Sequence, residues 1–250
     1  MGTYMTEAIV LKHEPWREAD RAVVLYSREY GKMTAVARSA RKISSKLAGC
    51  LEPFSLIQLT LAHGRTFETI AGADELYTYP KIRRHLPSVA LAGLMAEIVD
   101  RSTYTSQPDQ RLFELIDHSF RNLERTDRVS TTDAKMVTWR FVWRFLGIVG
   151  FLPELHHCQV CRERIREERN WFVHKKGGLV CPRCRQAADG GLAMEPDMIK
   201  IVRWLVADTP APARIKTPEA LSQAVGRLTN GFLNYTHEHD LDFTPFLKLA

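Results

Sequence analysis

The sequence predicts an α+β multidomain protein with a small β-barrel, an α-helical bundle and a four-cysteine module inserted into that bundle. Three observations support this fold class. Short strand-like runs separated by turn residues fill the first 80 residues. Apolar residues then recur at helical spacing, and two Cys-x2-Cys pairs interrupt the helical part. We therefore expect a barrel over residues 1–80, a helical domain over residues 81–155 and 191–250, and a metal-binding module over residues 156–190.

The barrel is predicted from five mostly apolar runs of strand length. These runs cover residues 6–11, 21–27, 33–37, 54–61 and 67–71. A turn is expected at residues 29–32, where Gly31 supplies a permissive backbone, and another at residues 63–65. Five short strands at this spacing suit a small barrel.

The helical bundle is predicted from a change of hydrophobic period after Pro87. Helices are expected over residues 91–99, 112–123, 133–149, 196–206 and 217–235. In the third of these, Trp139 and Trp143 lie on a different side from Phe141, so this helix should be nearly surrounded by protein. Asp133 is a candidate N-cap for it. Thr217, followed by Pro218, is a helix start for the last one.

Four of the five cysteines form two pairs with identical spacing. They are Cys158, Cys161, Cys181 and Cys184. Two such pairs joined by a hairpin are typical of a zinc ribbon, in which four thiolates bind one Zn²⁺ ion tetrahedrally. A closed four-thiolate shell leaves no place for water, so the site should be structural. A redox role is the alternative, although matched pairs favour zinc. Cys50 stands alone and is expected to be a small buried hydrophobe.

Positive charge concentrates in one segment near the N-terminus. The whole chain carries 35 Lys and Arg against 29 Asp and Glu, a formal net charge of +6. Residues 28–46 include six basic side chains and a single acid, Glu29. Long cations on a polar loop beside a β-surface suit a phosphate backbone. We expect DNA contacts from Lys32, Arg38, Arg41, Lys42 and Lys46. A merely solvated loop is the alternative.

A second basic cluster lies in the cysteine module, where acids dilute it. Its cations are Arg162, Arg164, Arg166, Arg169, Lys175, Lys176, Arg183 and Arg185, and the acids are Glu163, Glu167 and Glu168. We therefore rank this cluster below the loop as a nucleic-acid groove.

The sequence contains none of the common enzymatic motifs. It contains no P-loop, GxSxG, HExxH or clustered DxD pattern. The stretch of residues 237–240, with two histidines, is better explained as a polar helix end than as a metal site. No apolar run approaches the length of a membrane helix, and no signal peptide opens the chain. We expect a cytoplasmic binding protein without a membrane partner.

Several short motifs follow one another along the chain in a specific order. These motifs are Glu18-Ala19-Asp20-Arg21, Glu29-Tyr30-Gly31-Lys32, Ala37-Arg38-Ser39-Ala40-Arg41-Lys42, Leu51-Glu52-Pro53-Phe54, Trp139-Arg140-Phe141 with Leu146-Gly147, and the four-cysteine insert. Their order resembles the RecO family of bacterial recombination mediators, and the resemblance spans nearly the whole chain. Two departures stand out: Ser39 occupies a position where the family usually has glycine, and Val142 one where an acid is common.

The resemblance implies an OB-fold at the N-terminus, a helical domain and a zinc module. It also implies an activity that is not enzymatic turnover. Family members bind single- and double-stranded DNA, anneal complementary strands and, with RecR, help load recombinase onto DNA coated by single-strand-binding protein. They also bind the acidic C-terminal tail of that protein, and Arg140 resembles the arginine of this contact. A structural ion pair in the bundle is the alternative role for Arg140. The implied location is the nucleoid.

Two other functional classes remain open from the residues alone. A zinc-ribbon protein that binds RNA or the ribosome would also be basic, but would not prefer DNA coated by single-strand-binding protein. A metal-dependent nuclease would need acidic ligands at an open site and would degrade the strand. Tyr26, Phe54 and Phe67 can stack on bases if they point outward, although we expect Phe54 and Phe67 in the core.

Overall fold

The computed structural model describes residues 2–43, 45–64, 66–125, 131–187, 189–209, 217–236 and 246. The described chain divides into two compact units, one extending to Arg125 and the other from Thr131 to Thr236. Within these residues, no helix combines the length and apolar character that crossing a membrane requires. The stretch of residues 237–240, considered above as a metal site or helix end, lies outside the described residues.

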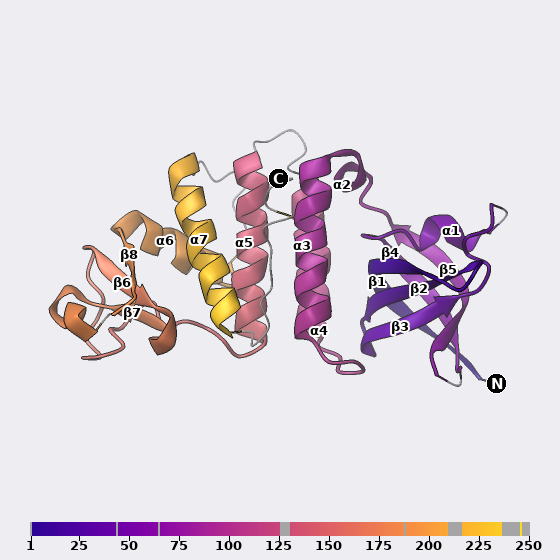
Figure 1. Cartoon of the computed structure of the whole chain (residues 1–250), viewed down its shortest axis with the longest axis horizontal. Coiled ribbons are helices and arrows are strands. Elements are labelled where there is room, and N and C mark those ends of the chain that lie inside the picture. Colours follow the sequence, from indigo (N-terminus) through magenta and orange to yellow (C-terminus); the bar gives the residue numbers. More distant parts are fainter. Residues whose placement is uncertain are drawn as a thin grey trace. The chain divides into compact units, whose positions relative to one another are not determined.

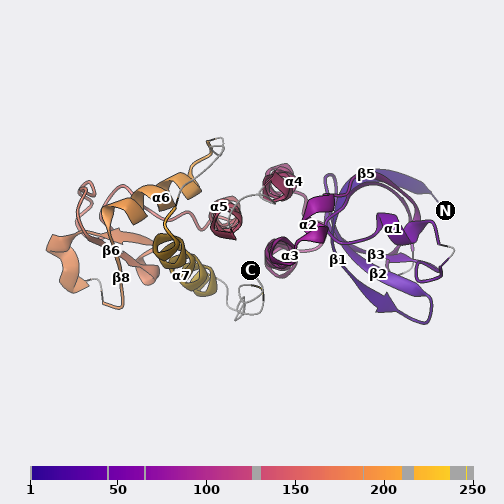
Figure 2. The ribbon, with the colours of Figure 1, turned by 90° about the horizontal axis from the view of Figure 1, so that it is seen from above.

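Five strands of the first unit close into a barrel (Figure 1). They are β1 (Thr3–Trp16), β2 (Asp20–Ser27), β3 (Gly31–Ala37), β4 (Leu56–Ala62) and β5 (Glu68–Tyr77). Their order is β1-β2-β3-β5-β4, and seen nearly end-on they form a ring (Figure 2). Only the short β3–β5 pairing is parallel. The predicted OB-fold is therefore confirmed.

The barrel core follows from strand alternation. Met33, Ala35 and Ala37 on β3 point inward and are buried, whereas the residues between them are only half-buried. Gly31 begins β3 with a φ of +69°, and a Cβ at this position would clash with the carbonyl group of Gln107. Only glycine meets both constraints without strain, as expected for the turn predicted there.

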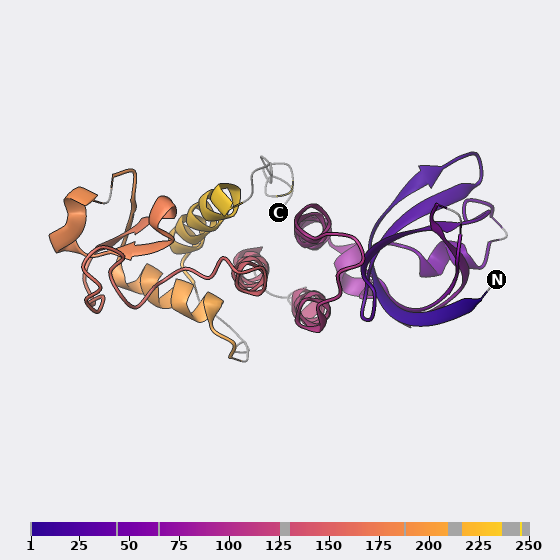
Figure 3. The same cartoon turned by 90° about the horizontal axis from the view of Figure 1, so that it is seen from below.

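Three helices complete the first unit beside the barrel. They are α2 (Pro80–Arg84), α3 (Leu86–Ser102) and α4 (Gln110–Arg125), and a short helix α1 (Leu47–Cys50) connects β3 to β4. The axes of α3 and α4 run side by side next to the barrel wall (Figures 2 and 3). Phe120 of α4 packs edge-on against Phe54, with ring centroids 5.5 Å apart, and so anchors the helices to the barrel.

The second unit combines three helices with a small sheet. Its elements are α5 (Thr131–Ile148), β6 (Asn170–Val173), β7 (Gly178–Val180), β8 (Leu192–Met194), α6 (Pro196–Val206) and α7 (Glu219–Thr236). Helix α5 packs against both α6 and α7. Trp143 of α5 stacks on Phe232 of α7 and donates a hydrogen bond to Thr229 Oγ1 at 2.9 Å. Buried residues lie on all sides of α5, as its two tryptophans predicted.

Some local predictions differ from the structure. Asp133 lies inside the first turn of α5 rather than at its N-cap. Helix α7 begins at Glu219, and the Thr217 hydroxyl makes no hydrogen bond with the described residues. Cys50 is half-buried rather than buried. Strand β8 was not predicted, because its three residues carry too little pattern.

The two compact units also partition the chain differently from the three predicted domains. Helices α2–α4 belong to the unit of the barrel, and α5–α7 belong to the unit of the cysteine module. The boundaries at residues 80, 155 and 190 stay a prediction.

Candidate nucleic-acid interface and metal centre

The basic loop connects the end of β3 to α1 and comprises residues 38–46, of which residue 44 is not described. Backbone hydrogen bonds hold it against the turn between β1 and β2. The Ser39 N–H donates to Asp20 Oδ1 at 2.8 Å, and the Arg41 N–H donates to the Ala19 carbonyl at 2.9 Å. The Arg41 guanidinium also donates to the Glu18 carbonyl at 3.0 Å. The loop is therefore tethered to the barrel at several points.

Four predicted DNA-binding residues lie together on this loop. Arg38, Arg41, Lys42 and Lys46 are all exposed, and none forms an ion pair with any residue that the structure describes. Their charge is thus left for an external anion. The tip between them carries Ile43, which is fully exposed.

Lys32 is not part of this group. It lies near the opposite end of β3, about 20 Å from Arg38 at the usual rise per strand residue. Its ammonium group is 3.5 Å from Asp100 Oδ1 on α3 and also donates to the Asp100 carbonyl. The structure therefore gives Lys32 an acidic partner inside the first unit.

An exposed aromatic pair accompanies the loop. Trp16, at the end of β1, lies edge-on to Phe67, with ring centroids 5.7 Å apart, and both residues are more than a third exposed. The expectation of a core position for Phe67 is therefore wrong, whereas Phe54 is buried as expected. Tyr26 is also buried, and its hydroxyl accepts the Asp109 N–H, so it offers no stacking face.

Trp16 and its neighbour Arg17 are site candidates that the sequence did not reveal. Arg17 is exposed in the β1–β2 turn, where its carbonyl accepts a hydrogen bond from Arg41. The turn lies about 20 residues before the loop in the chain, and the β2–β3 pairing brings the two segments together. The sequence analysis did not predict Trp16 and Arg17 as site residues because it did not include the pairing of β2 with β3.

The second unit brings the four predicted metal ligands together. The sulfur atoms of Cys158, Cys161, Cys181 and Cys184 all lie within 4.8 Å of one another. The Cys161 and Cys181 sulfurs are 3.8 Å apart. A tetrahedral ion with metal–sulfur bonds of about 2.3 Å separates its ligands by about 3.8 Å, so the donors fit such an ion. This group can hold a metal ion.

Local backbone geometry prepares the thiols for a metal. The N–H groups of Val160 and Cys181 each donate to Cys158 Sγ at 3.4 Å. Burial alone would raise the pKa of the Cys158 thiol, but hydrogen bonds from the backbone N–H groups of Cys161, Cys181 and Val160 outweigh it and lower the pKa to about 6. A lowered pKa favours the thiolate, which is the form that binds metals. The neighbouring His157 instead lies 3.7 Å from Glu154.

Arg140 lies on α5 and is buried. Its guanidinium donates to the carbonyls of Trp204 and Ala207, at 2.6 and 2.9 Å, and to that of Thr209. It also stacks over the Trp204 ring at 4.4 Å. These acceptors lie at the C-terminal end of α6, where carbonyls lack helical partners and the helix dipole is negative. Arg140 therefore caps α6 in this structure.

Comparisons with known proteins cover nearly the whole chain. The family model described as "Recombination protein O N terminal" matches residues 1–79, and "Recombination protein O C terminal" matches residues 83–242. A protein of Geobacter metallireducens named "DNA repair protein RecO" is 30% identical over 248 residues, covering 99% of this chain and 98% of its own. A Desulforamulus reducens protein with the same name is 28% identical over 248 residues, covering 99% and 94%.

Proposed function

The chain belongs to the RecO family, with a role in DNA repair and recombination, and from this membership we propose a specific activity for it. It binds single- and double-stranded DNA and anneals complementary strands. With RecR, it helps load recombinase onto DNA coated by single-strand-binding protein. It acts as a binding protein rather than through catalytic turnover, and its place is at the nucleoid in the cytoplasm.

The observation that carries this proposal is the uncompensated charge of the basic loop. Arg38, Arg41, Lys42 and Lys46 are exposed on an OB-fold and form no ion pair with the described residues. The exposed rings of Trp16 and Phe67 lie on the same barrel. Cations for phosphates beside aromatic faces for bases are the combination that binds single strands.

This arrangement suggests how annealing is assisted. Two strands repel each other through their phosphates, and cations that neutralise some phosphates lower this repulsion. The neutralised phosphates release counterions, so binding weakens steeply with salt. Trp16 and Phe67 would stack with bases that are not yet paired. A strand held in this way keeps its bases available to a complementary strand.

The second unit supplies the remaining parts of the proposal. The four cysteines hold one Zn²⁺ ion, because thiolate ligands at this spacing favour zinc and leave no open coordination position. This ion stabilises the module.

We also propose that the acidic tail of single-strand-binding protein binds to the second unit, near Arg140. In support, Arg140 is a buried cation that forms no ion pair in the described part of the chain.

The first test is annealing of two complementary oligonucleotides coated with the cognate single-strand-binding protein. The chain should accelerate annealing, and added salt should remove the acceleration. If annealing is unaffected while naked DNA still binds, the mediator role is overturned, and the alternative of a zinc-ribbon RNA or ribosome binder gains support. Degradation of the strand in magnesium would instead indicate a nuclease.

A double variant tests the loop itself. Arg41→Ala with Lys42→Ala should weaken binding of a single strand and flatten the slope of log K against log salt by about 1.4, which is two phosphate contacts. Arg101→Ala with Arg111→Ala is the matched control, because it removes two cations of the first unit that already have acidic partners. Equal slopes for the two double variants would exclude the loop from the DNA path.

A further inference from the structure

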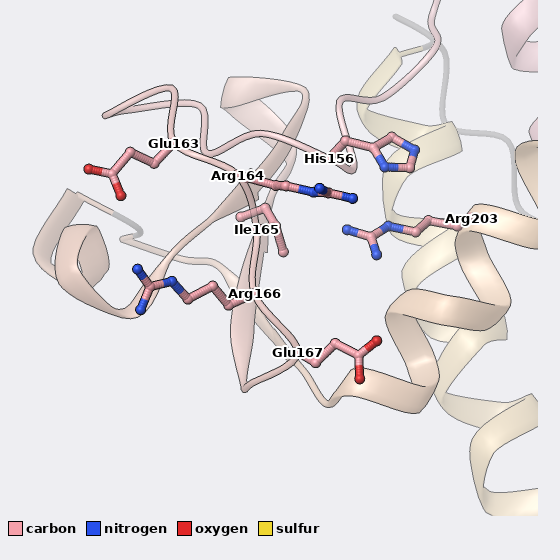
Figure 4. Close-up of a pocket in the computed structure, with 7 residues that line it drawn as sticks. All are labelled: His156, Glu163, Arg164, Ile165, Arg166, Glu167 and Arg203. Atoms are coloured by element: carbon pink, nitrogen blue, oxygen red, sulfur yellow. The ribbon is translucent and has the colours of Figure 1, made fainter.

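A second cationic site lies in the second unit, away from the loop in sequence. A cavity of about 530 Å³ opens between the segment that follows the first cysteine pair and α6. Its lining residues are His156, Glu163, Arg164, Ile165, Arg166, Glu167 and Arg203 (Figure 4). All of them lie in the same compact unit.

Two guanidinium groups converge in this cavity. Arg164 and Arg203 point toward each other in Figure 4, and the ring of His156 lies beside them. The Arg203 Nε and Nη2 atoms both donate to the Leu155 carbonyl, at 3.1 and 2.7 Å. These bonds fix the guanidinium in place, but a neutral carbonyl leaves its charge uncompensated.

The acids of the cavity do not neutralise this pair. Glu163 forms an ion pair with Arg183, and Glu167 lies 3.5 Å from the Lys200 ammonium. The nearby Glu154 accepts the backbone N–H groups of His156 and His157. The Arg164 guanidinium forms neither an ion pair nor a hydrogen bond with the residues described in the structure.

Two guanidinium groups that face each other attract an anion, and the residues that line the cavity indicate which kind of anion fits. A phosphate accepts hydrogen bonds from two guanidinium forks at once. A peptide that ends in an apolar residue and a carboxylate would also need an apolar slot. Ile165 is the single apolar lining residue, and it is 6% exposed. The cavity therefore suits a hydrophilic polyanion better than such a peptide.

We propose that Arg164 and Arg203 form a phosphate-binding site for the backbone of a DNA strand, separate from the basic loop. This inference rests on the proposed function and extends it. One chain then has a DNA contact on each compact unit, so it can hold two strands at once.

The experiment uses the zinc-loaded full chain carrying Arg41→Ala and Lys42→Ala, so that the cavity is the remaining proposed contact, and a labelled oligothymidylate of about 15 nucleotides, a length that fits a single binding site. Arg164→Gln is the main variant, because this exposed side chain has no hydrogen-bond or ion-pair partner among the described residues whose loss would disturb folding. Lys176→Gln is the matched control, since it removes one exposed cation of the same module outside the cavity. Arg164→Gln should reduce the slope of log K against log salt by about 0.7, which corresponds to one phosphate contact. The control should change this slope less.

Arg203→Gln should produce a similar loss, with zinc content and melting temperature confirming that the module is intact. Equal effects of Arg164→Gln and Lys176→Gln would overturn the site. So would an Arg164→Gln variant that loses binding of an acidic peptide with a free carboxylate but keeps DNA binding. If the Arg41→Ala, Lys42→Ala double variant by itself abolishes DNA binding, the cavity is excluded as a DNA contact, and the proposed function still stands. Absence of DNA binding by the unmodified chain would overturn both.

Discussion

Ser39 carries backbone strain at the entrance of the basic loop. Its φ is +55°, a left-handed conformation that disfavours residues with a Cβ, and its N–H is engaged by Asp20. The sharp turn that starts the loop imposes this positive φ.

Ser39→Gly should therefore stabilise the first unit. Removing the strain gains about 1–2 kcal/mol, and the entropy of glycine in the unfolded chain costs about 0.5–1 kcal/mol, so a net gain of about 0.5–1 kcal/mol is expected. Denaturant unfolding measures it. Ser45→Gly, at a serine of the same loop without a positive φ, should destabilise instead. A lower free energy of unfolding in Ser39→Gly would show that the positive φ of Ser39 does not destabilise the unmodified protein.

At the scale of elements, the end of α6 depends on one side chain of α5. Arg140 donates to three carbonyls there, whereas its neighbour Arg144 pairs with the exposed Asp208. Arg140→Ala should lower the free energy of unfolding by about 2 kcal/mol, because three partly buried carbonyls lose a charged donor. Arg144→Ala should cost less than about 1 kcal/mol, as for a surface pair.

Arg140→Lys extends this test, because one ammonium cannot span three carbonyls as a planar guanidinium does. It should be closer in stability to Arg140→Ala than to the unmodified protein. Thermal unfolding monitored by tryptophan fluorescence is suited to this unit, since Trp143 and Trp204 lie on the two helices concerned. An unchanged melting temperature in both Arg140 variants would exclude the capping role.

At the scale of the whole molecule, the two compact units should respond separately to loss of the metal. All four cysteine ligands lie in the second unit, and the basic loop lies in the first. Cys181→Ser should abolish zinc binding and lower the unfolding temperature of the second unit, because metal-binding energy is folding energy in such modules. The barrel should retain part of the DNA binding.

The matched control for this variant is Cys50→Ser, which alters the one cysteine outside the cluster. Metal analysis of protein purified without chelator gives the zinc content, and calorimetry separates the transitions. Retention of zinc by Cys181→Ser would contradict a four-thiolate shell. A complete loss of DNA binding on metal removal would show that the units are not independent.

Much of the architecture was predictable from local pattern. All five barrel strands and the long helices produce repeating hydrophobic patterns, and the structure extends several of them by a few residues. The short elements α1, α2 and β8 were missed, because three to five residues complete no periodic pattern. Phe67 was placed wrongly because hydrophobicity alone predicts burial, whereas its ring lies exposed against Trp16.

The sequence by itself determined the strand and helix content, the spacing of the four cysteines and the concentration of cations near residue 40. These features depend on neighbours along the chain, where residue type and period are sufficient. Only the tertiary structure decided that Lys32 pairs with Asp100, that Trp16 at the end of β1 lies next to the turn that holds the basic loop, and that Arg164 faces Arg203 (Figure 4). Each of these depends on strand pairing or packing between distant segments. Such contacts decide which charges are neutralised and which remain available for DNA.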